Sequence, residues 1–125
     1  MPSDRVLRAA LWCSVALNAL GVAVFLPMAI GGRSPLLPVA ASPFLAANTA
    51  LTIALFGGVY GWLALQPKFN RALVLVGGLG KLGFFALAVT YAVVGVVPVR
   101  MAVNATPDLI LAVIFLTWAR TRQPA

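Results

Sequence analysis

Four long runs of apolar residues dominate the chain, and short segments rich in proline, glycine or charge separate them. The runs cover about residues 6–30, 44–65, 71–97 and 101–120. A helix that crosses the hydrocarbon core of a bilayer needs about 20 mostly apolar residues. The pattern therefore predicts an all-α integral membrane protein, in which residues 1–125 form one transmembrane domain built as a four-helix bundle.

Glycine and proline mark the ends of the first and third runs. Gly31 and Gly32 follow the first run, and glycine is common just past the end of a helix. Pro98 follows the third run and should end its helix. The segment 31–43 contains three prolines, which exclude a regular helix there. Since this segment is also apolar, we expect it to lie at the membrane interface.

The fourth run contains a helix-start signal in its interior. Thr106-Pro107-Asp108 offers an N-cap threonine, a proline at the first helical position and an acid in the first turn. A helix starting there would reach only roughly 21 Å to Arg120, short of a hydrocarbon core of about 30 Å. We therefore expect the helix to begin near Met101 and to break or kink at Thr106-Pro107.

Composition agrees with a surface that faces lipid. Hydrophobic residues make up 62% of the chain and charged residues 9%, against about 45–50% and about 25% in soluble domains. The net charge is +7, but the charges lie singly or in pairs at the ends of the runs. No basic stripe with interleaved aromatic residues is present, so the pattern argues against nucleic acid as a partner.

Histidine is absent and one cysteine is present. These counts exclude a disulfide within the chain, a zinc site of the Cys/His type and a histidine-ligated haem. No metal and no cofactor are predicted.

Two signals indicate that both termini lie on the cytoplasmic side, the N-in/C-in orientation. With that orientation the positive residues divide six to two between the inner and outer sides, as the positive-inside rule requires. The inner set is Arg5, Arg8, Lys68, Arg71, Arg120 and Arg122, and the outer set is Arg33 and Arg100. Trp12, Trp62 and Trp118 all fall near the inner ends of the runs, as an interfacial aromatic belt predicts.

Small residues in the second and third runs predict close helix packing, because helices in lipid associate through close backbone contact. The second run has an i+4 series of small residues, with two further glycines on the same broad face. The residues predicted to pack are Ala50, Ala54, Gly57, Gly58, Gly61, Gly77 and Gly80, with Ala46 beginning the series. The partner can be another helix of the chain or a second copy.

Three polar residues lie deep within the predicted spans. Lys81 lies ten residues beyond Arg71, or roughly 15 Å from the inner boundary at the α-helical rise. Asp108 lies twelve residues before Arg120, or roughly 18 Å from the same boundary. Asn18 lies at a similar depth on the first span. A charge at such depth is a functional-site hypothesis, and here the two charges reach similar depths on neighbouring helices.

Two further polar residues are predicted to join this interior polar cluster. Asn104 lies four residues before Asp108 and would share its face on a continuous helix. Tyr91 lies within about a third of a turn of the Lys81 face. The cluster has two interpretations, which stay open: an ion pair that fixes helix register, or a site for a ligand, an ion or a proton.

Several short motifs resemble those of a known group of proteins. They are Gly57-Gly58-Val59-Tyr60-Gly61-Trp62, a proline-containing inner turn, Gly80-Lys81, and Asp108-Leu109-Ile110. The arrangement resembles small four-span bacterial membrane proteins of unknown function that are broadly DoxX-like. The resemblance implies a four-helix bundle in the bacterial plasma (inner) membrane and, for some relatives, quinone or sulfur redox chemistry. That activity is not carried over, since this chain lacks histidines and paired cysteines.

Two functional hypotheses follow. The first is a non-enzymatic accessory or structural membrane protein, with a bundle that binds a lipid or other apolar molecule. The alternative is a small oligomeric transporter that uses Lys81 and Asp108 as a gating or proton-coupled pair. Small multidrug transporters have four short spans, but they depend on an acid in the first span, where this chain has Asn18. No nucleophile, base and orienting residue occur together, so an enzyme is the least favoured class. Expected partners are the bilayer and either another copy of the chain or a membrane complex.

Overall fold

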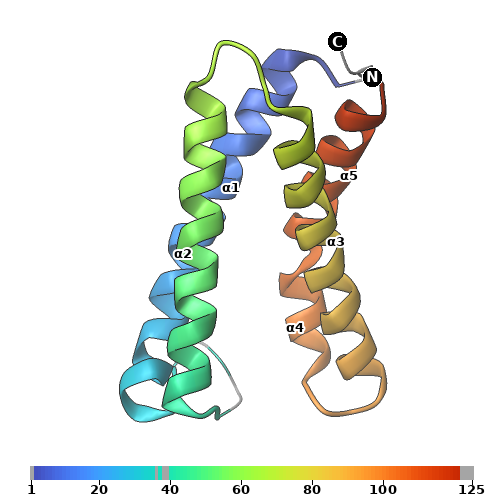
Figure 1. Ribbon diagram of the computed structural model, residues 1–125. Helices are drawn as coiled ribbons and strands as arrows, with labels where there is room; N and C mark the ends of the chain where they lie inside the picture. Colours follow the sequence, from blue (N-terminus) through green and yellow to red (C-terminus); the bar gives the residue numbers. More distant parts are fainter. Residues whose placement is uncertain (1, 36, 38–39, 122–125) are drawn as a thin grey trace.

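The computed structural model describes residues 2–35, 37 and 40–121, and its helices follow the four apolar runs (Figure 1). Helix α1 spans Asp4–Gly31, α2 spans Pro43–Leu65 and α3 spans Arg71–Val93. The fourth run forms α4, Val99–Asn104, and α5, Thr106–Thr121. Each of the four runs is long and apolar enough to cross a membrane, so the prediction of four apolar helices is confirmed. Arg122 and part of the 31–43 segment lie outside the described residues.

Polar side chains begin α1 and α3. Ser3 Oγ accepts a hydrogen bond from the Val6 amide at 3.2 Å, and Asn70 Oδ1 accepts one from the Leu73 amide at 3.1 Å. These bonds satisfy amides that have no partner within the first turn of a helix. Proline stands in the first turn of α2, where its missing N–H removes no helical bond.

Glycines in the left-handed region follow α1 and α3. Gly32 has φ of 73°, directly after α1, as the sequence predicts. Gly95 has φ of 80°. Helix α3 ends at Val93, four residues before the predicted boundary at Val97. The Gly95 amide bonds the Ala92 carbonyl at 3.2 Å, and the next amide bonds the Tyr91 carbonyl at 2.9 Å. This paired pattern satisfies the last carbonyls of the helix, so a glycine inside the apolar run, and not Pro98, sets its end.

The fourth run breaks at Ala105, one residue before the predicted position. Pro107 has no N–H to continue the helical ladder, which accounts for the break. Thr106 is the first residue of α5 and not the predicted N-cap before it, and its hydroxyl donates back to the Ala102 carbonyl at 3.5 Å. The break places Asp108 in the first turn of α5, where the helix dipole favours a negative charge.

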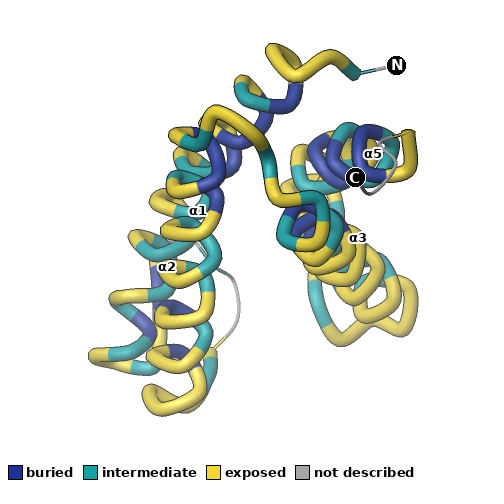
Figure 2. The backbone as a smooth tube through the Cα atoms, turned by 45° about the horizontal axis from the view of Figure 1, so that its top comes forward, coloured by how far each residue is buried: buried dark blue, intermediate teal, exposed yellow. Residues whose placement is uncertain are grey.

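The helices pack as two hairpins. Helix α1 lies along α2, and α3 lies along α4 and α5 (Figures 1 and 2). The hairpins meet at the end of the molecule where α1 begins and α5 ends, called here the termini end, and separate toward the opposite end (Figure 1). The shared core lies at the termini end and includes Leu7, Leu11, Leu63, Val74, Phe115 and Trp118.

Two arginines bind backbone carbonyls across helices at the termini end. The Arg8 guanidinium donates to the carbonyl oxygens of Ala64 and Gln66, where α2 ends. Arg71 Nε donates to the Ala119 carbonyl at 2.6 Å, in the last turn of α5. The last carbonyls of a helix have no intrahelical partners and carry partial negative charge, so these arginines satisfy them and close this end.

The tryptophans divide between core and surface. Trp12 and Trp62 are exposed on the flanks of the helices. Trp118 is buried, donates from Nε1 to Asp4 Oδ1 at 2.9 Å, and meets the Phe69 ring edge-on at 5.7 Å between centroids. Trp118 therefore belongs to the core and not to a lipid-facing belt, because its face of α5 points toward the other hairpin.

The small-residue series of α2 also divides. Ala46 and Ala50 are buried, but Ala54 and Gly58 are exposed, and a Cβ at Gly58 would meet nothing within 4 Å. Steps of four residues advance by about 40° around a helix, so Ala46 and Gly58 point about 120° apart. The predicted packing role of Ala54 and Gly58 is therefore wrong within the chain.

The observed face of α2 toward α1 follows a different spacing. Ala50, Ile53 and Gly57 are separated by three and four residues, which keeps one seam between two helices. A Cβ on Gly57 would lie 3.1 Å from the Asn18 Cβ, and one on Gly21 would lie 3.2 Å from Ile53 Cγ2. These glycines let the backbones of α1 and α2 approach closely.

Candidate functional site

The two interior charges form an ion pair. Lys81 Nζ, in the middle of α3, donates to Asp108 Oδ1, in the first turn of α5, at 2.7 Å. The side chain of Lys81 is 4% exposed and that of Asp108 is 22% exposed. Both residues belong to the second hairpin, so the pair holds α3 to α5 and does not itself join the two hairpins.

Tyr60 connects this pair to the first hairpin. It lies on α2, is 3% exposed, and presents its ring to Lys81 Nζ at 5.0 Å from the centroid. Its ring meets that of Phe115 edge-on, with centroids 5.7 Å apart. A Cβ on Gly77 would lie 2.8 Å from Tyr60 Cε1, so the absence of a side chain at Gly77 lets Tyr60 reach α3. The sequence did not mark Tyr60 as a site residue.

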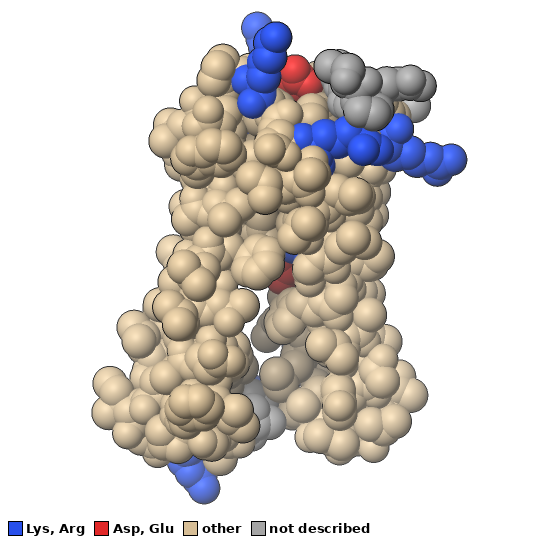
Figure 3. Space-filling model, in the orientation of Figure 1, with Lys and Arg blue, Asp and Glu red and all other residues tan. Residues whose placement is uncertain are grey.

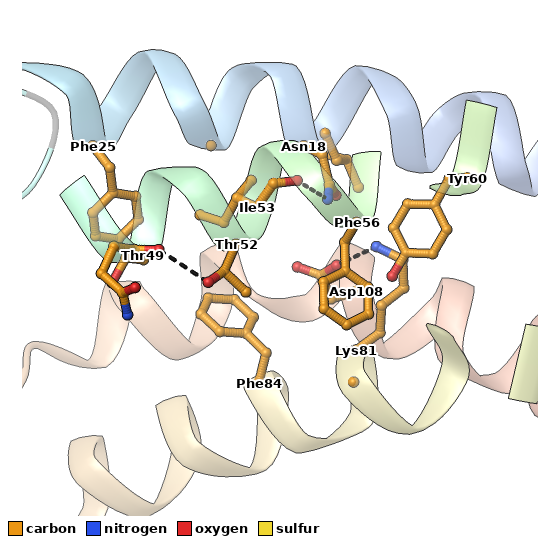
Figure 4. Close-up of a pocket in the computed structure, with 14 residues that line it drawn as sticks. Asn18, Phe25, Thr49, Thr52, Ile53, Phe56, Tyr60, Lys81, Phe84 and Asp108 are labelled. Atoms are coloured by element: carbon orange, nitrogen blue, oxygen red, sulfur yellow. Dashed lines mark hydrogen bonds and ion pairs between the residues drawn. The ribbon is translucent and has the colours of Figure 1, made fainter. Parts of the chain in front are cut away.

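Asn18 extends the polar group onto α1. Its Nδ2 donates to the Ile53 carbonyl on α2 at 2.8 Å. Figure 4 shows Asn18, Tyr60, Lys81 and Asp108 at one end of a pocket, each projecting from a different helix. The structure thus brings together three of the five residues predicted for the interior cluster and adds Tyr60.

The pocket is a cavity of about 400 Å³ between the two hairpins. Figure 3 shows the molecule hollowed between them, with charged atoms at the closed end of the hollow. Its walls are mainly apolar, and the ion pair lies at the closed end (Figure 4). The lining residues are Leu17, Asn18, Gly21, Phe25, Asn48, Thr49, Thr52, Ile53, Phe56, Tyr60, Gly80, Lys81, Phe84 and Asp108.

Three polar residues of α2 line the cavity and were missed in the sequence. Asn48, Thr49 and Thr52 lie on its α2 wall, away from the ion pair. Residues 48 and 52 are four apart and 49 lies beside them, so they share one side of the helix. Polar residues grouped on one side of an otherwise apolar helix are the signal that would have found them.

Asn104 and Tyr91 do not join the cluster. Tyr91 is exposed, and it lies ten residues beyond Lys81, about 15 Å further along α3, so it cannot reach the ion pair. Asn104 is exposed, because the break at Ala105 interrupts the helical register that would have placed it above Asp108. Neither residue lines the cavity.

The cavity offers binding groups and no visible reaction machinery. Among the described residues that line it, the charged groups are an amine and a carboxylate that neutralise each other, and none is an activated nucleophile. Comparisons with protein-family models, with curated proteins and with solved structures found no match. The functional assignment therefore rests on the geometry of the cavity.

Proposed function

We propose that the chain binds a lipid or other largely apolar molecule between its two hairpins, without converting it chemically. We further propose that it is a multi-pass protein of the bacterial inner membrane, with both termini in the cytoplasm. The observation that carries the proposed binding is the cavity of about 400 Å³, with apolar walls and an ion pair at its closed end. Small-molecule sites have volumes of about 300–1,000 Å³ and combine apolar walls with a few polar groups.

The orientation is supported by the distribution of charge. Basic side chains gather at the termini end in Figure 3. Arg33 follows the end of α1 and Arg100 lies in the first turn of α4, so both belong to the opposite end. By the positive-inside rule, this distribution supports a cytoplasmic termini end, with the cavity open toward the outer side. The resemblance to DoxX-like proteins and the expectation of a second copy or a membrane complex stay predictions.

Filling the cavity tests the proposal. Thr52 lines the cavity, and Leu55 lies one turn further along α2 on the exposed surface. We expect native mass spectrometry of the purified protein to find a copurified small molecule in the wild type and in Leu55→Trp, and none in Thr52→Trp. Equal retention by the two tryptophan variants, or no bound molecule in any of the three, would contradict the proposal.

A transporter is the second candidate, and one observation favours it. The hairpins pack closely at the termini end and separate at the other, so the cavity is closed toward one end only (Figures 1 and 3). Transporters bind substrate near mid-membrane and open the site to the two sides in turn. pH-dependent flux of a substrate in proteoliposomes, lost in a Lys81→Met/Asp108→Asn variant, would favour transport over binding alone.

A further inference from the structure

Three hydrogen-bond donors along the cavity are engaged within the protein. The hydroxyl of Thr49 donates to the Leu45 carbonyl and that of Thr52 to the Asn48 carbonyl, each at 2.9 Å. Asn18 Nδ2 donates to the Ile53 carbonyl at 2.8 Å. Since each of these hydrogens points into a helix backbone, the oxygen atoms of Thr49, Thr52 and Asn18 remain to accept hydrogen bonds.

The ion pair presents the same chemistry to the cavity. Lys81 is almost fully covered and directs its amine to Asp108 Oδ1, whereas the carboxylate side chain is 22% exposed. Among the described residues, Lys81 is the one hydrogen-bond partner of the Asp108 side chain. A carboxylate has about four acceptor positions on its two oxygens, so Asp108 can accept further bonds from a ligand.

Charge limits what such a ligand can be. Lys81 and Asp108 together are neutral, and the surrounding walls are apolar. An anionic ligand would meet the exposed carboxylate, and a cationic ligand would leave an unbalanced positive charge in a medium of low dielectric constant. A neutral ligand avoids both penalties.

We propose that the cavity selects an uncharged amphipathic molecule with a hydrogen-bond-donating head, such as a hydroxyl group, and that Asp108 accepts the bond from this head. The apolar body then lies along three phenylalanines that line the cavity, with Phe56 beside the pair and Phe84 and Phe25 further from it (Figure 4). Lys81 is a positioning residue, because it holds the carboxylate and balances its charge. This inference rests on the proposed binding function and adds the chemical class of the ligand.

Four probes of nearly equal length test the class. They are 1-dodecanol, methyl undecyl ether, dodecanoate and dodecylammonium, incubated in turn at equal concentration with the protein in nanodiscs, with occupancy read by native mass spectrometry. A hydrogen bond to a charged group contributes enough to change affinity by about tenfold or more. We expect the alcohol to bind at least about tenfold better than the ether, which differs in lacking the donor.

Two variants assign the effect to Asp108. Lys81→Met/Asp108→Leu leaves no unpaired charge, so we expect it to fold, to bind the ether as the wild type does, and to lose the preference for the alcohol. Thr90→Val removes a hydroxyl from α3 outside the cavity while keeping the shape of the side chain, and we expect it to keep that preference.

The outcomes separate the two proposals. Equal binding of alcohol and ether to the wild type, both excluded by Thr52→Trp, would overturn the selection of a donor head and leave the binding function standing. Stronger binding of dodecanoate or dodecylammonium than of the alcohol would overturn the neutral class. Binding of none of the four probes would overturn both.

Discussion

Removing Lys81 and removing Asp108 should destabilise the protein by different amounts, because the two side chains are buried to different extents. Lys81 is buried against the Tyr60 ring, whereas Asp108 borders the cavity. Breaking a buried pair by removing one partner typically costs about 3–5 kcal/mol. We expect Asp108→Asn to approach that loss because it strands the covered amine, and Lys81→Met to lose less because the carboxylate lies beside open space. Unfolding of the purified protein by added denaturing detergent measures the difference.

The double variant Lys81→Met/Asp108→Asn is the control for that prediction. It leaves no unpaired charge, so its free energy of unfolding should recover part of the sum of the two single losses. Losses that simply add would mean that the two side chains do not meet, since independent sites behave additively.

Lys81 and Asp108 could be predicted from the sequence as site residues, whereas Tyr60 could not, and the difference has a physical reason. A charge inside an apolar run is conspicuous, and the helical rise gives its depth, so the similar depths of Lys81 and Asp108 follow from counting residues. Tyr60 stands in a run that is apolar on every side, which gives no periodicity to indicate its face. Its contact with Gly77 depends on where the two hairpins cross, and that crossing is a property of the folded molecule.

Helices α2 and α3 approach each other through Gly77. A methyl group there would lie 2.8 Å from Tyr60 Cε1 and 3.4 Å from Phe115, both of which are buried. Overpacking of a filled core typically costs about 1–3 kcal/mol. We expect Gly77→Ala to lower the free energy of unfolding by that amount, measured by detergent-induced unfolding.

Gly83 on the same helix is the matched control. It is exposed, and a Cβ there would meet nothing within 4 Å. Alanine is a better helix former than glycine by about 0.5–1 kcal/mol, so Gly83→Ala should be neutral or stabilising. If Gly77→Ala and Gly83→Ala were equally stable, close packing at Gly77 would not position Tyr60.

Helix boundaries could be predicted where the residue that decides them lies outside the apolar run. Gly32 ends α1 as its sequence position indicates, but Gly95 is hidden inside an apolar run whose hydropathy continues to Val97. Likewise, the i+4 series on α2 predicted four packing residues, of which Ala46 and Ala50 are buried and Ala54 and Gly58 are exposed. Spacing alone does not give the crossing angle between helices, which decides which small residues face a partner.

At the scale of the whole molecule, the two ends are built differently. The termini end has the shared core and the arginines that bind the carbonyls of α2 and α5, whereas the other end has the space between the hairpins. The termini end therefore holds the two hairpins together, and the space at the other end is where we propose that a ligand binds. This division explains why the ion pair lies where the core gives way to the cavity.

The uneven distribution of positive charge between the two ends of the molecule predicts its topology in the membrane. Arg33 follows α1 and Lys68 follows α2, so four spans place them on opposite sides of the membrane. We expect reporter fusions at Lys68 to be active in the cytoplasm and those at Arg33 to be active outside.

Replacing the exposed Arg5, Lys68 and Arg120 with glutamine should weaken the orientation and yield a mixture, because the positive bias falls. Arg8 and Arg71 are left intact in that variant, since their bonds to carbonyls would confound orientation with stability. Reporters at Arg33 and Lys68 of the wild type that both report the same side would rule out the four-span topology.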